Sequence, residues 1–328
     1  MGEFELLARL RERLPPPGPR VRIGSGDDAA VTVPGGATAT SIDALVEGVH
    51  FRRETASLNQ IGRKALAAAL SDLAAMGAEP GEAYVAVGVP TDLDEAGCLE
   101  LIDGLIAIAA ETGTTLAGGD VTRAPALTLA VTVVGHAPSA ERLVSRGGAE
   151  PGDALVLTGE LGGAAAGLLL LERPQLAASV PEQTAARLRR RQLDPTPRLA
   201  AGHALAAAGA RAMIDLSDGL GGDAAHLAAA SGVGIRIDAA ALPLAAGVAE
   251  IAAAAGRDPL ELAASGGEDY ELLAALPPER AATALQGSTA AGDEARLTQI
   301  GEVTDGVGVE IRLPGGGILA PAGFDQLG

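Results

Sequence analysis

Residues 58–76 form an alanine- and leucine-rich stretch that predicts one long helix, closed by Gly77. Positions 65–76 are apolar on almost every side of this expected helix, which is typical of a helix buried in a protein core. A single carboxylate, Asp72, lies inside that apolar run. Because an unpaired carboxylate is costly to bury, a cationic group must meet Asp72 in the folded protein. The fold therefore has to bring a cation to a core helix.

Predicted helices and strands alternate along the rest of the chain. Apolar periodicity predicts further helices at 3–14, 94–111, 163–171, 182–191, 198–208 and 221–230. Alternating or continuous apolar runs predict strands at 29–33, 37–42, 84–89, 114–117, 127–136, 154–158, 211–216, 234–237, 271–276, 297–301 and 309–313. The turn Pro34-Gly35-Gly36 predicts a hairpin between the first two of these strands.

The 328 residues are enough for about two domains. The polar, glycine-bearing segment 138–151 separates two halves that each mix helices and strands, and there is no short repeat of the solenoid kind. The alanine run 252–255 is interpreted as plain helix. The sequence therefore predicts an α/β and α+β architecture in two domains, one over residues 1–138 and the other over 139–328.

Composition excludes several classes of partner. The 24 basic and 42 acidic residues give a net charge of −18, which argues against nucleic-acid binding. No apolar run approaches the roughly 18 residues of a membrane span, and the amphipathic N-terminus lacks the apolar core of a signal peptide. Cys98, the single cysteine, lies in an expected helix without a basic neighbour, which indicates a buried, inert thiol. We expect neither a nucleic-acid nor a membrane partner, and a cytoplasmic location.

Acidic side chains recur where apolar segments end, at Asp27, Asp28, Asp43, Asp120, Asp215 and Asp218. The carboxyl ends of strands are where α/β proteins bind ligands, and neighbouring glycines let a backbone approach a phosphate closely. Converging carboxylates repel one another unless divalent cations lie among them, and an all-oxygen ligand set favours Mg²⁺. The pattern predicts an enzyme that acts on a magnesium-bound nucleotide. The alternative is that these acids are helix caps and solvated loop ends.

The common nucleotide and metal motifs do not match. Lys64 is the only lysine, and its neighbours Arg63 and Ala65 exclude a Walker A loop. The glycine-rich segment 159–167 lacks dinucleotide spacing, which leaves a phosphate-binding loop or close helix packing as its role. The four histidines show no zinc-binding spacing.

Together, the motifs resemble those of the thiamine-monophosphate kinases, a family of the superfamily that includes aminoimidazole ribonucleotide synthetase and selenophosphate synthetase. The resemblance covers nearly the whole chain. It runs through Gly2-Glu3-Phe4, Gly24–Asp28, Ser41-Ile42-Asp43, Gly48-Val49-His50-Phe51, Leu70–Ala78, Gly118-Gly119-Asp120, Ser145-Arg146, Pro151-Gly152-Asp153, Ile214–Leu220 and Ser265–Leu272. The pieces at 48–51 and 265–271 point to this family within the superfamily.

The resemblance implies ATP-dependent phosphorylation of thiamine monophosphate to thiamine diphosphate, with several Mg²⁺ ions per active site. It also implies a homodimer whose N-terminal strands pair into a barrel, and a C-terminal α+β domain. The implied magnesium ligands are Asp28, Ser41, Ile42 through its backbone, Asp43, Asp72, Asp120, Asp215 and Asp218. Of these, Asp43, Asp72, Asp120 and Asp218 are the implied catalytic residues. The implied nucleotide contacts are Gly119, Asp120, Arg146 and Ser217, and the implied contacts to the thiamine compound are His50, Glu268 and Phe324.

The implied chemistry agrees with the residues present. A phosphate acceptor is already an anion, so direct in-line transfer needs no general base, and Mg²⁺ ions would offset the repulsion between two polyanions. Ile42 departs from the threonine that relatives often carry there, and its side chain offers no oxygen to Mg²⁺. Two alternatives stay open. One is another ATP-consuming enzyme of the superfamily, and the other is a catalytically silent nucleotide-binding dimer that serves as a scaffold.

Overall fold

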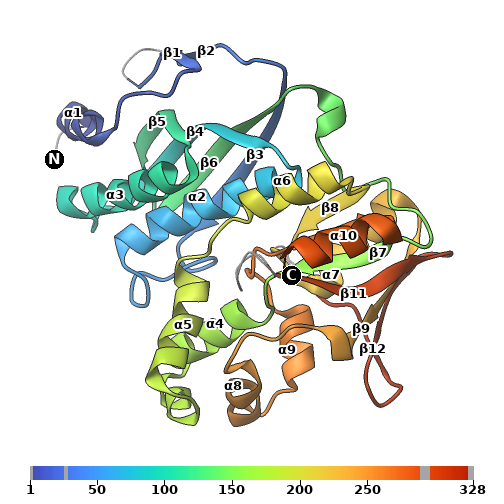
Figure 1. Cartoon of the computed structure of the whole chain (residues 1–328). Coiled ribbons are helices and arrows are strands. Elements are labelled where there is room, and N and C mark those ends of the chain that lie inside the picture. The colour runs from blue at the N-terminus through green and yellow to red at the C-terminus, as the bar shows by residue number, and fades with distance from the viewer. Residues whose placement is uncertain (1–2, 26–28, 289–295, 324–328) are drawn as a thin grey trace. The chain divides into compact units, whose positions relative to one another are not determined.

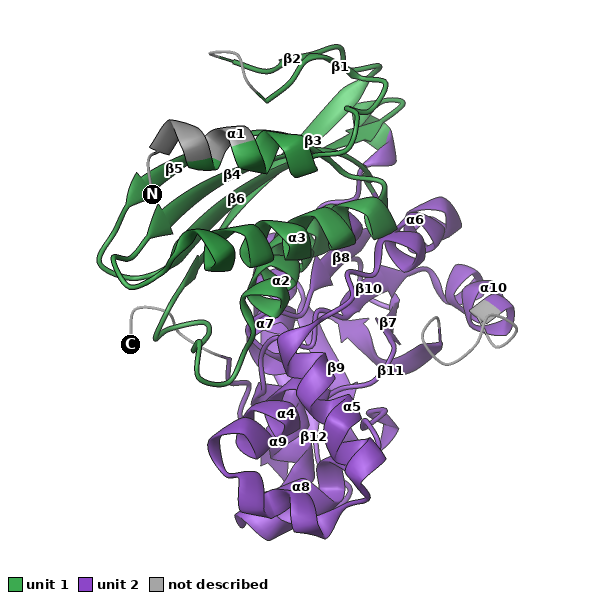
Figure 2. Ribbon diagram, turned by 90° about the vertical axis from the view of Figure 1, so that its left-hand side faces the viewer, with its two compact units in different colours: residues 1–73, 78–141 green, residues 74–77, 142–328 purple. Residues whose placement is uncertain are grey.

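The computed structural model describes residues 3–25, 29–288 and 296–323, so Asp27, Asp28 and Phe324 lie outside the described residues. The chain divides into two compact units (Figure 1, Figure 2). Unit 1 contains residues 1–73 and 78–141, and unit 2 contains residues 74–77 and 142–328. Each unit mixes helices and strands around its own sheet, so the expected mixed fold with two domains is confirmed.

Unit 1 is built on a four-stranded sheet. Its strand order is β3 (Ala37–Val46), β6 (Thr128–Ala137), β4 (Glu79–Val89) and β5 (Thr115–Arg123). β4 and β5 are parallel, and the other two pairs are antiparallel. The helices α2 (Leu58–Ala75) and α3 (Glu95–Thr112) lie along one face of this sheet (Figure 1). The long helix expected at 58–76 is therefore confirmed.

The hairpin expected between 29–33 and 37–42 is wrong. β2 (Val31–Thr32) pairs instead with β1 (Val21–Ile23) in a separate two-stranded sheet. β3 continues beyond residue 42 to Val46 and pairs along its whole length with β6. A ladder of this length supplies many more cross-strand contacts than a short local hairpin does, so β3 pairs with the distant strand β6.

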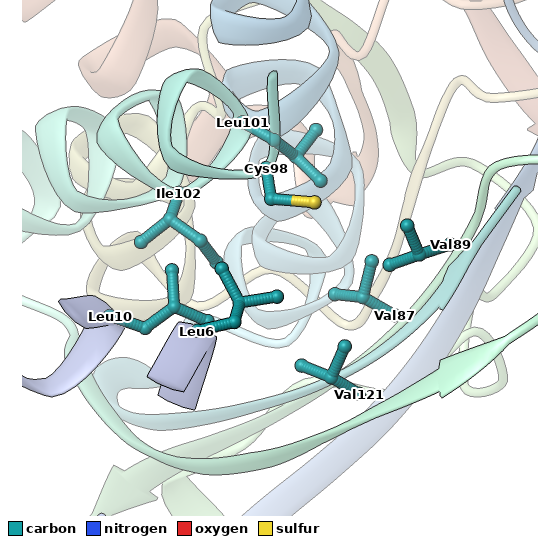
Figure 3. A pocket seen from close by; sticks show the side chains of 8 residues that line it. All are labelled: Leu6, Leu10, Val87, Val89, Cys98, Leu101, Ile102 and Val121. Carbon is teal, nitrogen blue, oxygen red and sulfur yellow. The ribbon is translucent and has the colours of Figure 1, made fainter. Parts of the chain in front are cut away.

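The N-terminal helix α1 (Glu3–Arg13) packs against α3 and the sheet. Leu6 and Leu10 lie beside Cys98 in a small apolar cavity that Val87 and Val121 also line (Figure 3). Burial raises the pKa of the Cys98 thiol, and the nearby carboxylates of helix α3 raise it further. The prediction of a buried thiol is confirmed, and the raised pKa makes it a poor nucleophile.

Unit 2 contains a seven-stranded mixed sheet. Its strand order is β13 (Ile318–Leu319), β12 (Gly308–Arg312), β9 (Gly234–Asp238), β11 (Leu297–Thr304), β7 (Ala154–Thr158), β10 (Leu272–Leu276) and β8 (Ala212–Asp215). Its α-helices are α4 (Gly163–Glu172), α5 (Glu182–Leu193), α6 (Leu199–Ala208), α7 (Leu220–Ser231), α8 (Val248–Ala255), α9 (Pro259–Ser265) and α10 (Pro278–Ser288). Short 3-10 turns occur at Ala140–Arg142, where the chain passes from unit 1 to unit 2, and at Pro174–Ser179 and Ala239–Ala241 in unit 2.

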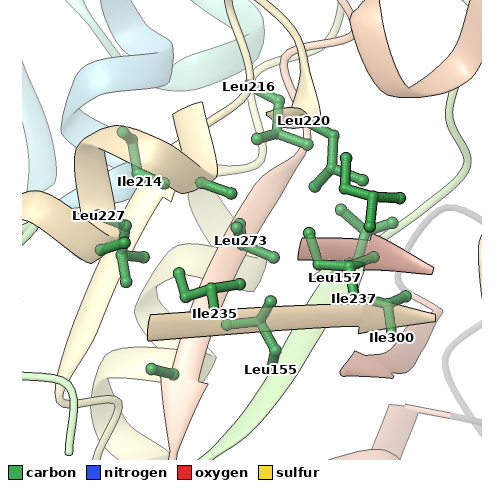
Figure 4. Packing of buried hydrophobic residues seen from close by; sticks show 14 of the residues in the cluster. Leu155, Leu157, Ile214, Leu216, Leu220, Leu227, Ile235, Ile237, Leu273 and Ile300 are labelled. Carbon is green, nitrogen blue, oxygen red and sulfur yellow. The ribbon is translucent and has the colours of Figure 1, made fainter. Parts of the chain in front are cut away.

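The two faces of this sheet bury separate cores. Leu157, Ile214 and Leu273 belong to the core that also contains α7 (Figure 4). Met213 points to the opposite face, because side chains alternate along a strand, and packs in a second core with α6. The last turn of α2 joins this second core: a side chain at Gly202 of α6 would lie 2.0 Å from the carbonyl oxygen of Ala74. Residues 74–77 therefore pack with unit 2.

The glycines of segment 159–167 let helices approach closely. A side chain at Gly167 of α4 would lie 2.2 Å from the carbonyl oxygen of Leu188 in α5, and one at Gly163 would meet the Arg191 side chain. Close packing therefore accounts for these two glycines. Among the described helices, none has the length and hydrophobicity that a membrane span requires.

Candidate functional site

A cluster of three oxygen-bearing side chains joins β3 to α2 in unit 1. The hydroxyl of Ser41 donates a hydrogen bond to Oδ2 of Asp72. Asp43 follows Ser41 by two positions, so its side chain leaves β3 on the same face. Asp43 does not close a strand as expected, because the ladder between β3 and β6 continues past it to Val46. We call Ser41, Asp43 and Asp72 the carboxylate cluster.

The two acids of this cluster repel each other. The pKa of Asp43 is raised to about 6, chiefly by burial and also by the negative charge of Asp72. Two carboxylates this close are stable together only if one is protonated or if a cation shares them. Asp72, on the apolar helix α2, and Asp43 therefore form a site that favours a bound cation.

The donor set of the carboxylate cluster fits Mg²⁺. All three side chains offer oxygen atoms, and Mg²⁺ commonly takes one or two carboxylates together with waters and substrate phosphates. Within the described residues, no three acidic, histidine or cysteine side chains gather in a group that could hold a metal ion. A metal at this cluster would therefore take its remaining ligands from water, from phosphate or from residues outside the described ranges.

Asp120 lies on the other face of the same sheet. It was expected after a strand, but it lies inside β5 and pairs with Ala86. Ala86 pairs with Ala130, which pairs with Ala44 of β3. Paired residues share a face of the sheet, so Asp120 is opposite Asp43 and its side chain is exposed. The described structure does not bring Asp120 into the carboxylate cluster.

Gly119 and Ile42 are explained by the sheet. A side chain at Gly119 would lie 2.2 Å from the carbonyl oxygen of Val85, so the close approach of β4 requires glycine there. Ile42 alternates with Ser41 and Asp43, and its side chain is 67% exposed on the opposite face. The Ile42 side chain therefore points away from the carboxylate cluster.

His50 lies in the loop that follows β3. Its Nδ1 accepts a hydrogen bond from the backbone N–H of Val46 at 3.1 Å, and its own backbone N–H donates to the Val46 carbonyl oxygen. Because Nδ1 is an acceptor, the ring proton of the neutral imidazole is on Nε2. His50 therefore presents an N–H donor.

In unit 2, Asp215 ends β8, and Ser217 and Asp218 lie on the turn between β8 and α7. Asp215 is the last residue of β8, as expected, and is buried. The carboxylate of Asp223 accepts hydrogen bonds from the backbone N–H groups of Asp218 and Gly219, at 3.1 and 3.0 Å. The pKa of Asp223 is raised to about 7: burial and the charge of Asp218 raise it, and those hydrogen bonds partly oppose the rise.

Arg146 belongs to the same neighbourhood. Its positive charge lowers the pKa of Asp223, although the net shift of that carboxyl is upward. Its carbonyl oxygen accepts a hydrogen bond from the Ser231 hydroxyl at 3.3 Å, and its side chain is exposed. The structure therefore places an exposed guanidinium beside the turn that carries Ser217 and Asp218.

Glu268 lies directly beside that turn. Its backbone N–H donates to the carbonyl oxygen of Ser217 at 2.8 Å, and the N–H of Tyr270 donates to the carbonyl oxygen of Leu216 at 2.9 Å. Glu268 and Tyr270 have positive φ angles, 66° and 49°, a left-handed conformation that costs a non-glycine residue roughly 1–2 kcal/mol. The carboxylate of Glu268 accepts a hydrogen bond from the amide of buried Gln192.

A buried charged network lies behind this segment, and sequence reasoning missed it. Arg198 donates two hydrogen bonds to the fully buried carboxylate of Glu271, at 2.8 and 2.7 Å. The hydroxyl of Thr158 donates to the same carboxylate at 2.7 Å and accepts from the N–H of Leu272. Arg191 adds a longer contact to Glu271, at 3.6 Å. The only signal in the sequence is an acid that directly precedes an apolar strand.

Comparisons with known proteins agree with this architecture. Two protein-family models match the chain. The family model for the N-terminal domain of AIR synthase related proteins matches residues 26–137, and the one for their C-terminal domain matches residues 150–314. The thiamine-monophosphate kinase of Salmonella typhimurium is 42% identical over 279 residues, which span 84% of this chain and 83% of that protein.

Two solved structures are similar over nearly their whole length. The crystal structure of thiamine-monophosphate kinase from Stenotrophomonas maltophilia K279a gives a TM-score of 0.81 at 36% identity, over 95% of this chain and 96% of that chain. The structure of AaThiL complexed with AMPPCP and TMP gives a TM-score of 0.77 at 31% identity, over 98% of this chain and 96% of that chain.

Proposed function

The chain belongs to the thiamine-monophosphate kinase family of the AIR synthase related proteins, and we propose that it transfers the terminal phosphoryl group of ATP directly to the phosphate of thiamine monophosphate. The products are thiamine diphosphate and ADP. The relative that was solved with AMPPCP and TMP supports this pair of substrates. The observation that carries the proposal is the carboxylate cluster, where Asp43 and Asp72 repel each other in the absence of a cation.

The carboxylate cluster is the proposed centre for magnesium. Bound Mg²⁺ would offset the charge of the two phosphate compounds and orient their oxygens. The further ligands in the proposal are Asp28, Ile42 through its carbonyl oxygen, Asp120, Asp215 and Asp218. Four of these belong to the set on the resemblance alone: Asp28 lies outside the described residues, Asp120 lies on the other face of the sheet from Asp43, and Asp215 and Asp218 belong to unit 2.

The remaining residues of the proposed set would bind and orient the substrates. Arg146 can form two parallel hydrogen bonds to a phosphate, which a lysine cannot, and Ser217 and Gly119 complete the proposed nucleotide contacts. The Glu268 carboxylate would offset the positive charge of the thiamine compound, His50 would donate from Nε2, and Phe324 would stack on a ring. No side chain has to act as a base, because the accepting phosphate is already an anion at neutral pH.

We also propose that the active form is a homodimer in which the sheets of two copies meet as a barrel. β3 is an edge strand of its sheet, and edge strands with exposed apolar side chains invite pairing with a second chain. Ile42, at the middle of this strand, is one such exposed side chain. Sedimentation velocity at micromolar concentration should give the mass of a dimer. A measured mass equal to that of a monomer would contradict the proposed dimer and its barrel.

The proposed activity is tested by incubating the purified chain with ATP, Mg²⁺ and thiamine monophosphate and separating the products by chromatography. The kinase makes thiamine diphosphate, and omission of Mg²⁺ or of thiamine monophosphate abolishes it. Another ATP-consuming enzyme of the superfamily would release ADP only with a different second substrate. A silent scaffold would bind ATP without turnover.

A further inference from the structure

Two aspartates outside the proposed contact residues hold the two turns of the unit 2 site. Asp269 accepts from the backbone N–H of Gly162 at 2.6 Å and from that of Ala164 at 3.0 Å, one bond to each carboxylate oxygen. Asp223 accepts from the backbone N–H groups of Asp218 and Gly219. Both carboxylates therefore bind main-chain donors, and each fixes a different stretch of backbone.

Asp269 stabilises a turn that is otherwise strained. It lies between Glu268 and Tyr270, which both adopt the left-handed conformation. Strained backbone of this kind persists only where surrounding contacts fix it. The two bonds from Asp269 attach the turn to the first residues of α4, which packs tightly on α5. These bonds thereby fix the backbone of Glu268, whose carboxylate accepts the hydrogen bond from the Gln192 amide.

Asp223 performs the same task on the neighbouring turn by a separate route. It lies in the first turn of α7, is almost fully buried, and binds the backbone that carries Asp218. The two turns also touch, because the backbone N–H groups of Glu268 and Tyr270 donate to the carbonyl oxygens of Ser217 and Leu216. The Ser217–Asp218 turn has two attachments besides these, the bonds to Asp223 and the pairing of β8 with β10. Loss of the Asp269 contacts should therefore disturb residues 265–272 more than the Ser217–Asp218 turn.

We propose that Asp269 and Asp223 are positioning residues for the two substrates, Asp269 for the thiamine compound through Glu268, and Asp223 for the nucleotide through Ser217 and Asp218. This inference rests on the proposed function. If the two aspartates served only stability, their loss would weaken the binding of both substrates alike. If each one positions its own turn, its loss weakens the binding of one substrate more than that of the other.

The test compares Asp269→Asn with Asp223→Ala. In Asp269→Asn the new amide N–H₂ faces a backbone donor, so the KM for thiamine monophosphate should rise about tenfold or more, while the KM for ATP stays within about twofold. Asp223 accepts both of its bonds on Oδ2, which an asparagine oxygen could replace, so alanine is the change that removes them, and it should show the reverse pattern. The matched control is Asp94→Asn, which changes the cap of α3 in unit 1. Asparagine caps a helix about as well as aspartate, so both KM values should stay within about twofold.

Hydrogen–deuterium exchange provides a readout that needs no activity. Asp269→Asn should speed exchange in residues 159–167 and 265–272, and Asp223→Ala should speed it in residues 217–222. If either variant does not fold, serine, which still offers one acceptor, replaces it. Equal shifts of both KM values in both variants, or unchanged exchange in these segments, would overturn the inference. A wild-type chain that makes no thiamine diphosphate would instead refute the proposed function, and the exchange pattern would still decide whether the two aspartates hold the turns.

Discussion

The backbone N–H of Glu268 donates a hydrogen bond to the carbonyl oxygen of Ser217 at 2.8 Å. Glu268 is the proposed contact to the thiamine compound, and Ser217 is a proposed contact to the nucleotide. Two motifs that are far apart in the sequence thus meet through their main chains in unit 2. A contact of this kind depends on backbone position and not on the identity of either side chain, so it is not visible in the sequence.

Replacement of Asp72 by asparagine should leave a folded protein that has lost most of its magnesium-dependent turnover. The amide can still accept the Ser41 hydrogen bond but carries no negative charge for a cation. Electrostatic groups of this kind contribute roughly 10²–10³-fold each to turnover, and more where a metal is lost with them. Steady-state kinetics at saturating substrates measures the effect. Asp103→Asn, at an exposed position of α3, is the control, and turnover like that of the wild type in Asp72→Asn would contradict the metal-binding role of Asp72.

The stability of the metal-free protein should depend on pH through Asp43. Its pKa is about 6 in the folded chain and has the ordinary value of 3.8 when the carboxyl is not buried. The folded state therefore binds this proton more tightly than the unfolded state does, so the stabilisation is complete below pH 3.8 and is lost as the pH rises through 6. Urea denaturation in EDTA measures the free energy of unfolding at pH 4.5 and at pH 7. Its decrease between the two pH values should be larger for the wild type than for Asp43→Asn. Equal decreases in the two proteins would show that Asp43 is not the group responsible for the pH dependence.

Ile42→Thr should change the magnesium dependence of activity little. The side chain at position 42 leaves β3 on the face opposite Ser41 and Asp43, so a threonine hydroxyl there could not join the carboxylate cluster. Magnesium titrations of the two proteins give the comparison. A drop of roughly tenfold or more in the magnesium that the threonine variant needs, about 1.4 kcal/mol of binding, would mean that a hydroxyl ligand is missing from this chain.

Glu271→Gln should destabilise unit 2 severely. The change leaves the guanidinium of Arg198, itself mostly buried, without its countercharge, and breaking a buried ion pair on one side typically costs about 3–5 kcal/mol. The control is Glu310→Gln, which breaks an exposed pair with Arg312 and should lower the free energy of unfolding far less, because water screens an exposed pair. Chemical denaturation of both variants tests the contrast. Similar losses in the two variants would show that the buried network contributes no more than a surface pair.

The elements with strong local patterns are predictable from the sequence. The long helix α2 and the strand β7, expected at 154–158, lie where apolar periodicity and glycine punctuation place them. The alanine run 252–255 is helical in α8, as expected. The pairing of β3 is not predictable in this way, because its partner β6 is distant in the sequence and the nearer turn at residues 34–36 favours a hairpin. The helices α9 and α10 are short and were not expected.

The candidate site is predictable only in part, for the same reason. The apolar surroundings of Asp72 reveal from sequence alone that this acid is unusual, but its partner Ser41 is brought to it by the packing of β3 against α2. The side of the sheet that Asp120 occupies depends on strand register, which a motif does not contain. Asp223 and Asp269 resemble ordinary helix-cap and loop acids in the sequence, and their roles depend on which backbone N–H groups the fold places beside them.

The proposed reaction is direct transfer of the terminal phosphoryl group of ATP to thiamine monophosphate. It is tested by incubating the chain with Mg²⁺, thiamine monophosphate and ATP labelled in its γ-phosphate, and then locating the label. Direct transfer gives one labelled thiamine diphosphate for each ADP, with the label in the terminal phosphate. Label found only in free phosphate, with no labelled thiamine diphosphate, would rule direct transfer out.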